Sequence, residues 1–172
     1  MTDTTKKVLV AYGTRAGSTA SVAERVAAVL KSNGFAAEAL PADKVRDVAS
    51  YGAVVLGSAV RAGKLMPEAL KFVEKNKAAI AARPFAAFVV CLTMKECDEK
   101  SRAAASAYLE PVRLRSKPLS EGLFGGVMDL AKLGVFERTI MKAMKAPQGD
   151  YRNWTEVEAW AAGLVPLFGT PR

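Results

Sequence analysis

The sequence contains no histidine, only two cysteines and few aromatic residues, and the first two absences exclude whole classes of function. Without histidine, imidazole metal ligands, Ser-His-Asp triads and imidazole proton shuttles are all excluded. Cys91 lies inside an apolar segment and Cys97 follows it, which is neither a disulfide framework nor a metal-ligand spacing. We therefore expect no metal site, no catalytic residue of these kinds and a reducing compartment.

Long hydrophobic runs are also missing. The longest, Phe85 to Leu92, has eight residues, whereas a membrane-spanning helix needs about 20. Met1 to Lys7 is polar and has no apolar segment typical of a signal peptide. We expect a soluble, cytoplasmic protein.

The chain instead has a formal net charge of +8 and 51% hydrophobic residues within 172 residues. This length suits one ordinary core, and no linker or repeat divides it, so residues 1–172 are expected to form a single domain. The positive charge favours an anionic partner such as a lipid surface, an acidic protein or an acidic substrate. Nucleic acid is not expected, because no recognition motif interleaves basic and aromatic residues.

Short apolar segments alternate with helical patterns along the chain. Strands are expected at 8–11, 36–40, 53–57, 85–92 and near 119–124, and helical patterns follow the first, third and fourth of them. A closing helix is expected to open with Thr155 and Glu158, which have the spacing of a capping box. This alternation predicts an α/β fold: a parallel sheet with helices on both faces.

In such a sheet, ligands bind beyond the carboxyl ends of the strands. The first loop there, Gly13 to Thr19, combines glycines, hydroxyls and Arg15 at the start of a helix, which favours an anion. Three residues separate Gly13 from Gly17, so the loop is not a Walker A motif, and the dinucleotide fingerprint G-x-G-x-x-G is absent. Ordinary capping of a helix explains the same composition and stays open.

Two further loops are expected at the same edge. Ser58 to Lys64 follows the third strand without a helical signal, and its glycines permit close approach to a flat ring. Thr93 to Cys97 occupies the equivalent position after the fourth strand. Either loop also has an ordinary surface-loop interpretation.

The segment Leu130–Ala146 is expected to be an amphipathic helix. Leu130, Leu133, Phe136, Ile140, Met141 and Met144 fall on one face, and Lys132, Arg138, Lys142 and Lys145 fall on the other. The apolar face either packs on the sheet or a second subunit, or rests on an anionic membrane.

The motifs "TRAGST", "VVLGSAVRAGKL", "FGGV", "FERTIMKAMK" and "GDYRNW" together resemble the flavodoxin-fold family, in the branch that includes bacterial quinone-dependent protoporphyrinogen dehydrogenases. The resemblance implies a doubly wound five-stranded sheet of order 2-1-3-4-5 that binds flavin mononucleotide (FMN). By the same resemblance, the FMN phosphate is held by Thr14, Arg15, Ala16, Gly17, Ser18 and Thr19. The flavin ring is bordered by Ser58, Ala59, Val60, Arg61, Ala62, Gly63 and Thr93, with Gly125 and Gly126 as further members.

Three functions remain open. The first is an FMN-dependent redox protein that transfers electrons to or from a partner protein or a quinone. The second is a quinone-dependent protoporphyrinogen IX dehydrogenase of heme biosynthesis, which would be an oxidoreductase located at the inner face of the cell membrane. Neither ring-facing loop contains an aromatic residue to stack on a flavin, so carrier and enzyme are not distinguished. The third is a non-redox anion-binding interaction domain, and a homo-oligomer is compatible with all three.

Overall fold

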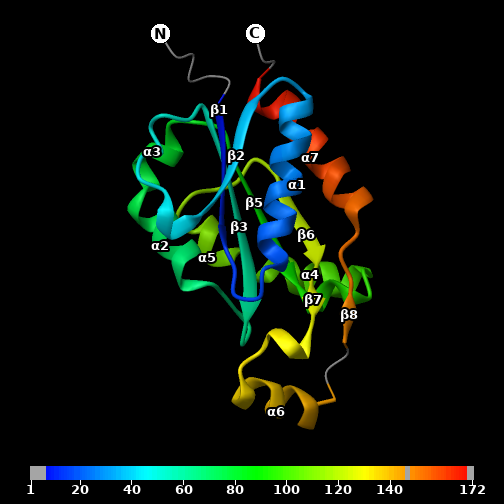
Figure 1. The fold of residues 1–172 in the computed structure, drawn as a ribbon. Coiled ribbons are helices and arrows are strands. Elements are labelled where there is room, and N and C mark those ends of the chain that lie inside the picture. The colour runs from blue at the N-terminus through cyan, green and yellow to red at the C-terminus, as the bar shows by residue number, and fades with distance from the viewer. Residues whose placement is uncertain (1–6, 146–147, 170–172) are drawn as a thin grey trace.

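The computed structural model describes residues 7–145 and 148–169, which form a sheet between two layers of helices (Figure 1). The strands are β1 (Lys7–Gly13), β2 (Ala36–Pro41), β3 (Ala53–Arg61), β4 (Lys64–Leu65), β5 (Phe85–Cys91), β6 (Glu121–Gly125), β7 (Val127–Met128) and β8 (Gly149–Asp150). The helices are α1 (Ser18–Ser32), α2 (Pro67–Lys75), α3 (Lys77–Ala81), α4 (Glu99–Ala107), α5 (Glu110–Arg113), α6 (Val135–Ala143) and α7 (Trp154–Phe168). Short 3₁₀ turns are η2 (Ala42–Lys44), η3 (Leu92–Lys95) and η4 (Leu130–Lys132).

The parallel sheet has the order β2-β1-β3-β5-β6, and β4 pairs antiparallel with the end of β3. Numbered among the parallel strands alone, this is the order 2-1-3-4-5, so the predicted fold class is confirmed. Tyr12 pairs with Gly57, and Gly13 with Ser58. This register brings the carboxyl ends of β1 and β3 side by side.

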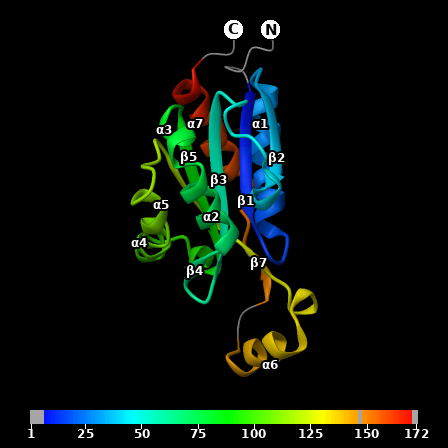
Figure 2. The same ribbon diagram turned by 90° about the vertical axis from the view of Figure 1, so that its left-hand side faces the viewer.

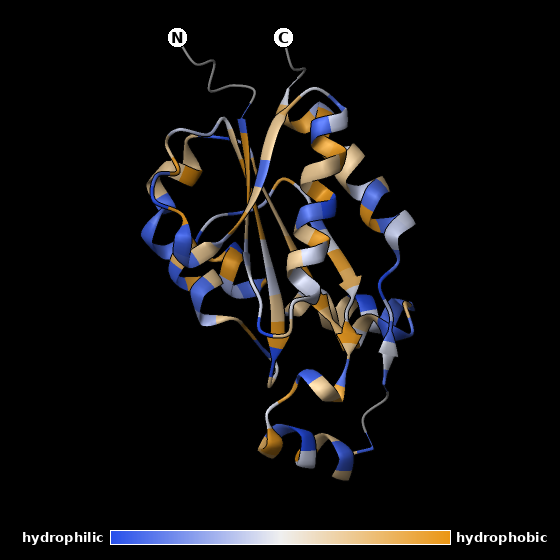
Figure 3. Cartoon of the chain, in the orientation of Figure 1, coloured by the Kyte–Doolittle hydropathy of each residue, from blue (hydrophilic) through white to orange (hydrophobic). Residues whose placement is uncertain are grey.

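Each face of the sheet has its own core because alternate residues of a strand point to opposite faces. Val8 and Val10 of β1 pack toward α1 and α7, whereas Leu9 and Ala11 pack toward α2, α3, α4 and α5. Every residue of β5 is buried, as expected for a strand covered on both faces. The hydrophobic colouring of the strands in Figure 3 follows this arrangement.

The start of α7 differs from the prediction. Its N-cap is Asn153, whose side chain accepts a hydrogen bond from the backbone N–H of Glu156. The capping box predicted at Thr155 and Glu158 is therefore wrong, since both residues lie inside the helix. Glu158 instead forms an ion pair with Arg25 of α1, which joins the two helices of this face.

The chain leaves the sheet after β6 at Val127 and is again beside it at Asp150, before α7. β7 and β8 pair antiparallel as a short ribbon, and η4 and α6 lie beyond the carboxyl edge of the sheet (Figures 1 and 2). The single helix predicted for Leu130–Ala146 is wrong: the backbone is extended at Leu133 and Gly134, so η4 and α6 are separate, and residue 146 is outside the described residues. No helix among the described residues has the length and apolarity to cross a membrane.

Candidate functional site

The first loop joins β1 to α1 and turns at Gly17. Gly17 is the N-cap of α1 with φ of +90°, a conformation that L side chains rarely adopt. Its N–H donates to Thr14 Oγ1 at 3.1 Å, which folds the loop back on itself. The first turn of α1 contains no acidic residue and Gly17 supplies no side-chain cap. Neither of these groups neutralises the positive end of the helix dipole, so the unpaired N–H groups of this first turn favour a bound anion.

Thr19 is the most informative side chain of this loop. The residue is completely buried, and its Oγ1 has no hydrogen-bond partner among the described residues. A buried hydroxyl without a partner costs free energy of folding, so its presence at a helix start points to a ligand that accepts its hydrogen. The oxygens of a phosphate group fit this donor.

The segment expected to be the second loop is a β-hairpin, so the prediction of a loop from Ser58 is wrong. β3 continues to Arg61, and β4 returns from Lys64 after a two-residue turn. Ala62 and Gly63 both have positive φ, +50° and +74°, as in the turns that suit the twist of a hairpin. The end of this hairpin extends past the carboxyl edge. Ala59 and Val60 are half-buried there, and its exposed part is Arg61, Ala62 and Gly63.

Ser58 has a structural role in this hairpin. Its hydroxyl donates to Ala59 O at 2.8 Å and accepts from the N–H of Met66 at 2.9 Å, and the residue is buried. These bonds fix the hairpin to the start of α2. The Ser58 hydroxyl is therefore occupied, and the exposed end of the hairpin is the part available to a ligand.

Thr93 lies in η3, immediately after β5. Its Oγ1 is 3.1 Å from the hydroxyl of Tyr108, so this side chain also has a partner within the fold. Two residues further on, the Lys95 ammonium lies 5.9 Å from the ring centre of Tyr151. Tyr151 follows β8 and is an aromatic residue beside the third loop that the loop sequences do not reveal.

Gly125 and Gly126 bring the end of β6 close to the first loop. A Cβ at Gly125 would lie 2.2 Å from the carbonyl oxygen of Tyr151, so only glycine fits there. A Cβ at Gly126 would lie 3.8 Å from Ser18 Oγ, which places the end of the fifth parallel strand next to the first loop. These two glycines therefore shape the edge of the site through their lack of side chains.

Arg152 supports the first turn of α1 from the other side. Its guanidinium donates to Ser21 Oγ at 2.8 Å and pairs with Asp150 at 2.6 Å. The hydrogen bonds from Arg152 lower the pKa of Asp150, so this carboxylate stays ionised. Trp154 stacks with both Arg152 and Arg25, at 4.9 Å and 4.7 Å from their guanidinium carbons. The "GDYRNW" motif thus connects the start of α7 to the first half of α1.

Glu137 of α6 contacts both arginines of the predicted site. One of its carboxylate oxygens, Oε1, lies 3.2 Å from Arg15 Nη2 and also contacts Arg61 Nη2. The Glu137 side chain is only 20% exposed although no residue of α6 is buried. The sequence identifies Glu137 as the only acid of its segment, but not as the link between the first loop and the hairpin.

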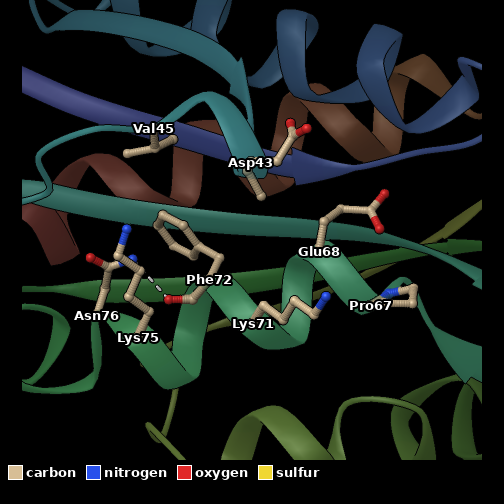
Figure 4. Close-up of a pocket in the computed structure, with 9 residues that line it drawn as sticks. Asp43, Val45, Pro67, Glu68, Lys71, Phe72, Lys75 and Asn76 are labelled. Carbon is tan, nitrogen blue, oxygen red and sulfur yellow. Dashed lines mark hydrogen bonds between the residues drawn. The ribbon is translucent and has the colours of Figure 1, made fainter.

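The described structure thus gathers Thr14 to Thr19, Arg61 and Gly126 at one edge, and Ser58 and Thr93 serve mainly to position it. A separate hollow of about 290 Å³ lies between η2 and α2, lined by residues such as Asp43, Lys71 and Phe72 (Figure 4). It contains none of the predicted cofactor residues. The edge with the unpartnered Thr19 hydroxyl and the arginine pair is the better candidate site.

Comparison with known proteins identifies the family and the fold of the chain. The family model described as a flavodoxin domain matches residues 9–155. A protoporphyrinogen IX dehydrogenase [quinone] of Leishmania major is 27% identical over 138 residues, which cover 73% of this chain and 59% of that protein. The protein of the same name from Escherichia coli K12 is 24% identical over 178 residues, covering 96% of this chain and 98% of that protein. Among solved structures, a flavodoxin from the domain Archaea has a TM-score of 0.59 at 15% identity, covering 94% and 98% of the two chains.

Proposed function

The chain belongs to the flavodoxin domain family, and on this basis we propose that it binds FMN and transfers electrons through it. The observation that carries the proposal is the buried Thr19 hydroxyl, which has no partner among the described residues. It lies in the first turn of α1, and this turn contains no acidic residue. A phosphate monoester supplies the acceptors and the negative charge that this position favours.

The residues present suit the parts of FMN. The backbone N–H groups at the start of α1, with Thr14, Ser18 and Thr19, would hold the phosphate. The exposed end of the β3–β4 hairpin and η3 around Thr93 would border the ring. Bound FMN supplies the electron chemistry, and the protein contributes its position and electrostatic surroundings.

Binding of FMN and riboflavin to the purified protein tests this proposal. We expect FMN to bind more tightly than riboflavin, because riboflavin lacks the phosphate, and the double variant T14A/T19A to lose that difference. Equal binding of the two flavins, or no binding of either, would show that the loop is not a phosphate site. The variant S32A, at the far end of α1, is the control and should bind FMN as the parent protein does.

A more specific candidate is a quinone-dependent protoporphyrinogen IX dehydrogenase, an enzyme of heme biosynthesis. The names of the curated relatives and the match to the full length of the Escherichia coli protein support it. Its test is anaerobic incubation of the FMN-loaded protein with protoporphyrinogen IX and menaquinone. Porphyrin fluorescence that appears only with quinone supports the enzyme, and reduction of the flavin by other donors alone supports an electron carrier.

We also propose that α6 contacts an anionic membrane surface, where a lipid-soluble quinone is accessible. Val135, Phe136 and Met144 are 81%, 78% and 71% exposed, and Lys132, Lys142 and Lys145 are exposed positive charges of the same segment. Figure 3 shows that α6 carries both hydrophobic and hydrophilic residues. Like charges oppose a second copy at this face, whereas anionic headgroups complement them.

Flotation with vesicles tests the membrane contact. The protein should bind vesicles rich in phosphatidylglycerol and not pure phosphatidylcholine, and F136S/M144S should reduce this binding about tenfold or more, as expected for two apolar side chains. Leu114 is 73% exposed on another surface, so L114S is the matched control and should bind normally. Failure to float, a loss of similar size in L114S, or self-association through α6 would each contradict a membrane role.

A further inference from the structure

Two arginines from separate elements converge on one carboxylate oxygen at the candidate site. Arg15 belongs to the phosphate loop and Arg61 to the end of β3, and both contact Glu137 Oε1. Two guanidinium groups this close repel each other unless an anion lies between them. The fold therefore holds a position that requires an anion, and in this structure the anion is a side chain of α6.

The attachment of α6 allows this anion to be exchanged. α6 buries none of its residues, and the segment that carries it is closed at its base by the pairing of β7 with β8. Arg138 donates to the carbonyl oxygens of Leu130, Ala131 and Leu133, so η4 and α6 are held together as one unit. Releasing Glu137 thus breaks its two ion pairs without exposing a buried residue of α6.

We propose that Arg15 and Arg61 form a subsite for the carboxylate of an apolar redox substrate, and that Glu137 occupies it until that substrate binds. The inference rests on the proposed function, because the subsite adjoins the edge where the flavin is placed. A guanidinium pair recognises a carboxylate by charge and hydrogen bonding. Ile140 and Met144, three and seven residues after Glu137 and therefore on the same side of the helix, are exposed and offer apolar contact to the rest of such a molecule.

Equilibrium binding of a dicarboxylate porphyrin tests the subsite. The probes are protoporphyrin IX and its dimethyl ester, titrated into the FMN-loaded protein with porphyrin fluorescence as the readout. We expect E137Q to bind the free acid about tenfold more tightly, since a competing carboxylate is removed, and R61Q to bind it about tenfold less tightly. R61K keeps the positive charge but lacks the planar guanidinium group, so its affinity for the free acid should lie between those of the parent protein and R61Q. Binding of the ester should not change in any variant.

The control variant is E99Q, which changes the net charge equally. Glu99 is exposed at the start of α4 and forms no ion pair within the described ranges 7–145 and 148–169. Equal effects of E137Q and E99Q, or equal effects on acid and ester, would overturn the proposal. Thermal melting of each variant verifies folding, and FMN absorbance reports separately whether the proposed cofactor site fails.

Release of Glu137 has a second readout. In the parent protein, protoporphyrin IX should increase tryptic cleavage at Lys142 and Lys145, because α6 loses its link to Arg15 and Arg61. The dimethyl ester should leave cleavage unchanged. Unchanged cleavage with saturating free acid would show that Glu137 is not displaced.

Discussion

Replacing Thr19 by valine is expected to move stability and FMN affinity in opposite directions. The Thr19 hydroxyl is fully buried and has no partner among the described residues, and such a group costs about 1–3 kcal/mol when it is left unsatisfied. Valine keeps the branched shape and removes the polar atom. We expect T19V to raise the free energy of unfolding of the FMN-free protein by about 1 kcal/mol, or about 2–4 °C in Tm for a chain of this size.

The same substitution removes a donor to the proposed phosphate. A hydrogen bond to a charged group contributes about 1.5–3 kcal/mol, so the Kd for FMN should rise about tenfold to a hundredfold. Urea denaturation followed by circular dichroism measures the first effect, and flavin fluorescence titration measures the second. Riboflavin should bind parent and variant equally, because it carries no phosphate.

T139V is the matched control for this experiment. The Thr139 hydroxyl is exposed and donates to Val135 O at 2.9 Å, so its loss should neither stabilise the protein nor alter FMN binding. A T19V protein that is less stable and binds FMN normally would refute the reasoning. It would mean that the hydroxyl contributes to packing and has no ligand.

Three further predictions concern the surrounding fold. A62G should stabilise the protein by up to about 1 kcal/mol, as measured by urea denaturation. Alanine at φ of +50° is strained by about 1–2 kcal/mol, whereas glycine costs about 0.4–1 kcal/mol in chain entropy. Lower stability of A62G would contradict this. Burial, together with the hydrogen bond that Tyr51 donates to Glu38, raises the Tyr51 pKa to about 12. Because the folded state holds this proton more tightly, the contribution of Tyr51 to stability should be complete below pH 10 and be lost as pH rises toward 12. Titration of the tyrosine phenolates in the parent and in Y51F measures this. If Y51F lacks no high-pKa group, the prediction is disproved. Arg113 donates two hydrogen bonds to Glu121, at 2.6 and 2.7 Å. Lysine cannot keep both, so R113K should lower the free energy of unfolding by about 1–3 kcal/mol. Urea denaturation of R113K that matches the parent protein would count against this.

The strands were predictable because the pattern that forms them is local, whereas their order was predicted only from the resemblance to the flavodoxin-fold family. β5 is a continuous apolar segment that is buried on both faces, and a continuous apolar segment of this length is typical of a central parallel strand. The glycine and hydroxyl pattern of the first loop likewise identifies a helix start that favours an anion. Both features depend on residues that are neighbours in the sequence.

The hairpin and the broken helix were not predictable in the same way. The turn after Arg61 contains Ala62 at positive φ, where asparagine or glycine is the usual signal. Gly134 interrupts an amphipathic pattern whose periodicity continues through the break. The meeting of Glu137 with Arg15 and Arg61 depends on the path of the chain through β7 and η4, and no spacing in the sequence records it.

The ribbon of β7 and β8 closes the excursion of residues 127–150 at its base, where the Tyr151 N–H donates to Gly126 O at 2.9 Å. The chain therefore leaves and rejoins the sheet at nearly the same place. Because of this closure, the length and composition of the protruding segment are free to vary without altering strand register or either core. The sheet and its two helix layers stay fixed. A change of substrate or docking surface made in the protruding segment therefore requires the fewest compensating changes in the rest of the protein.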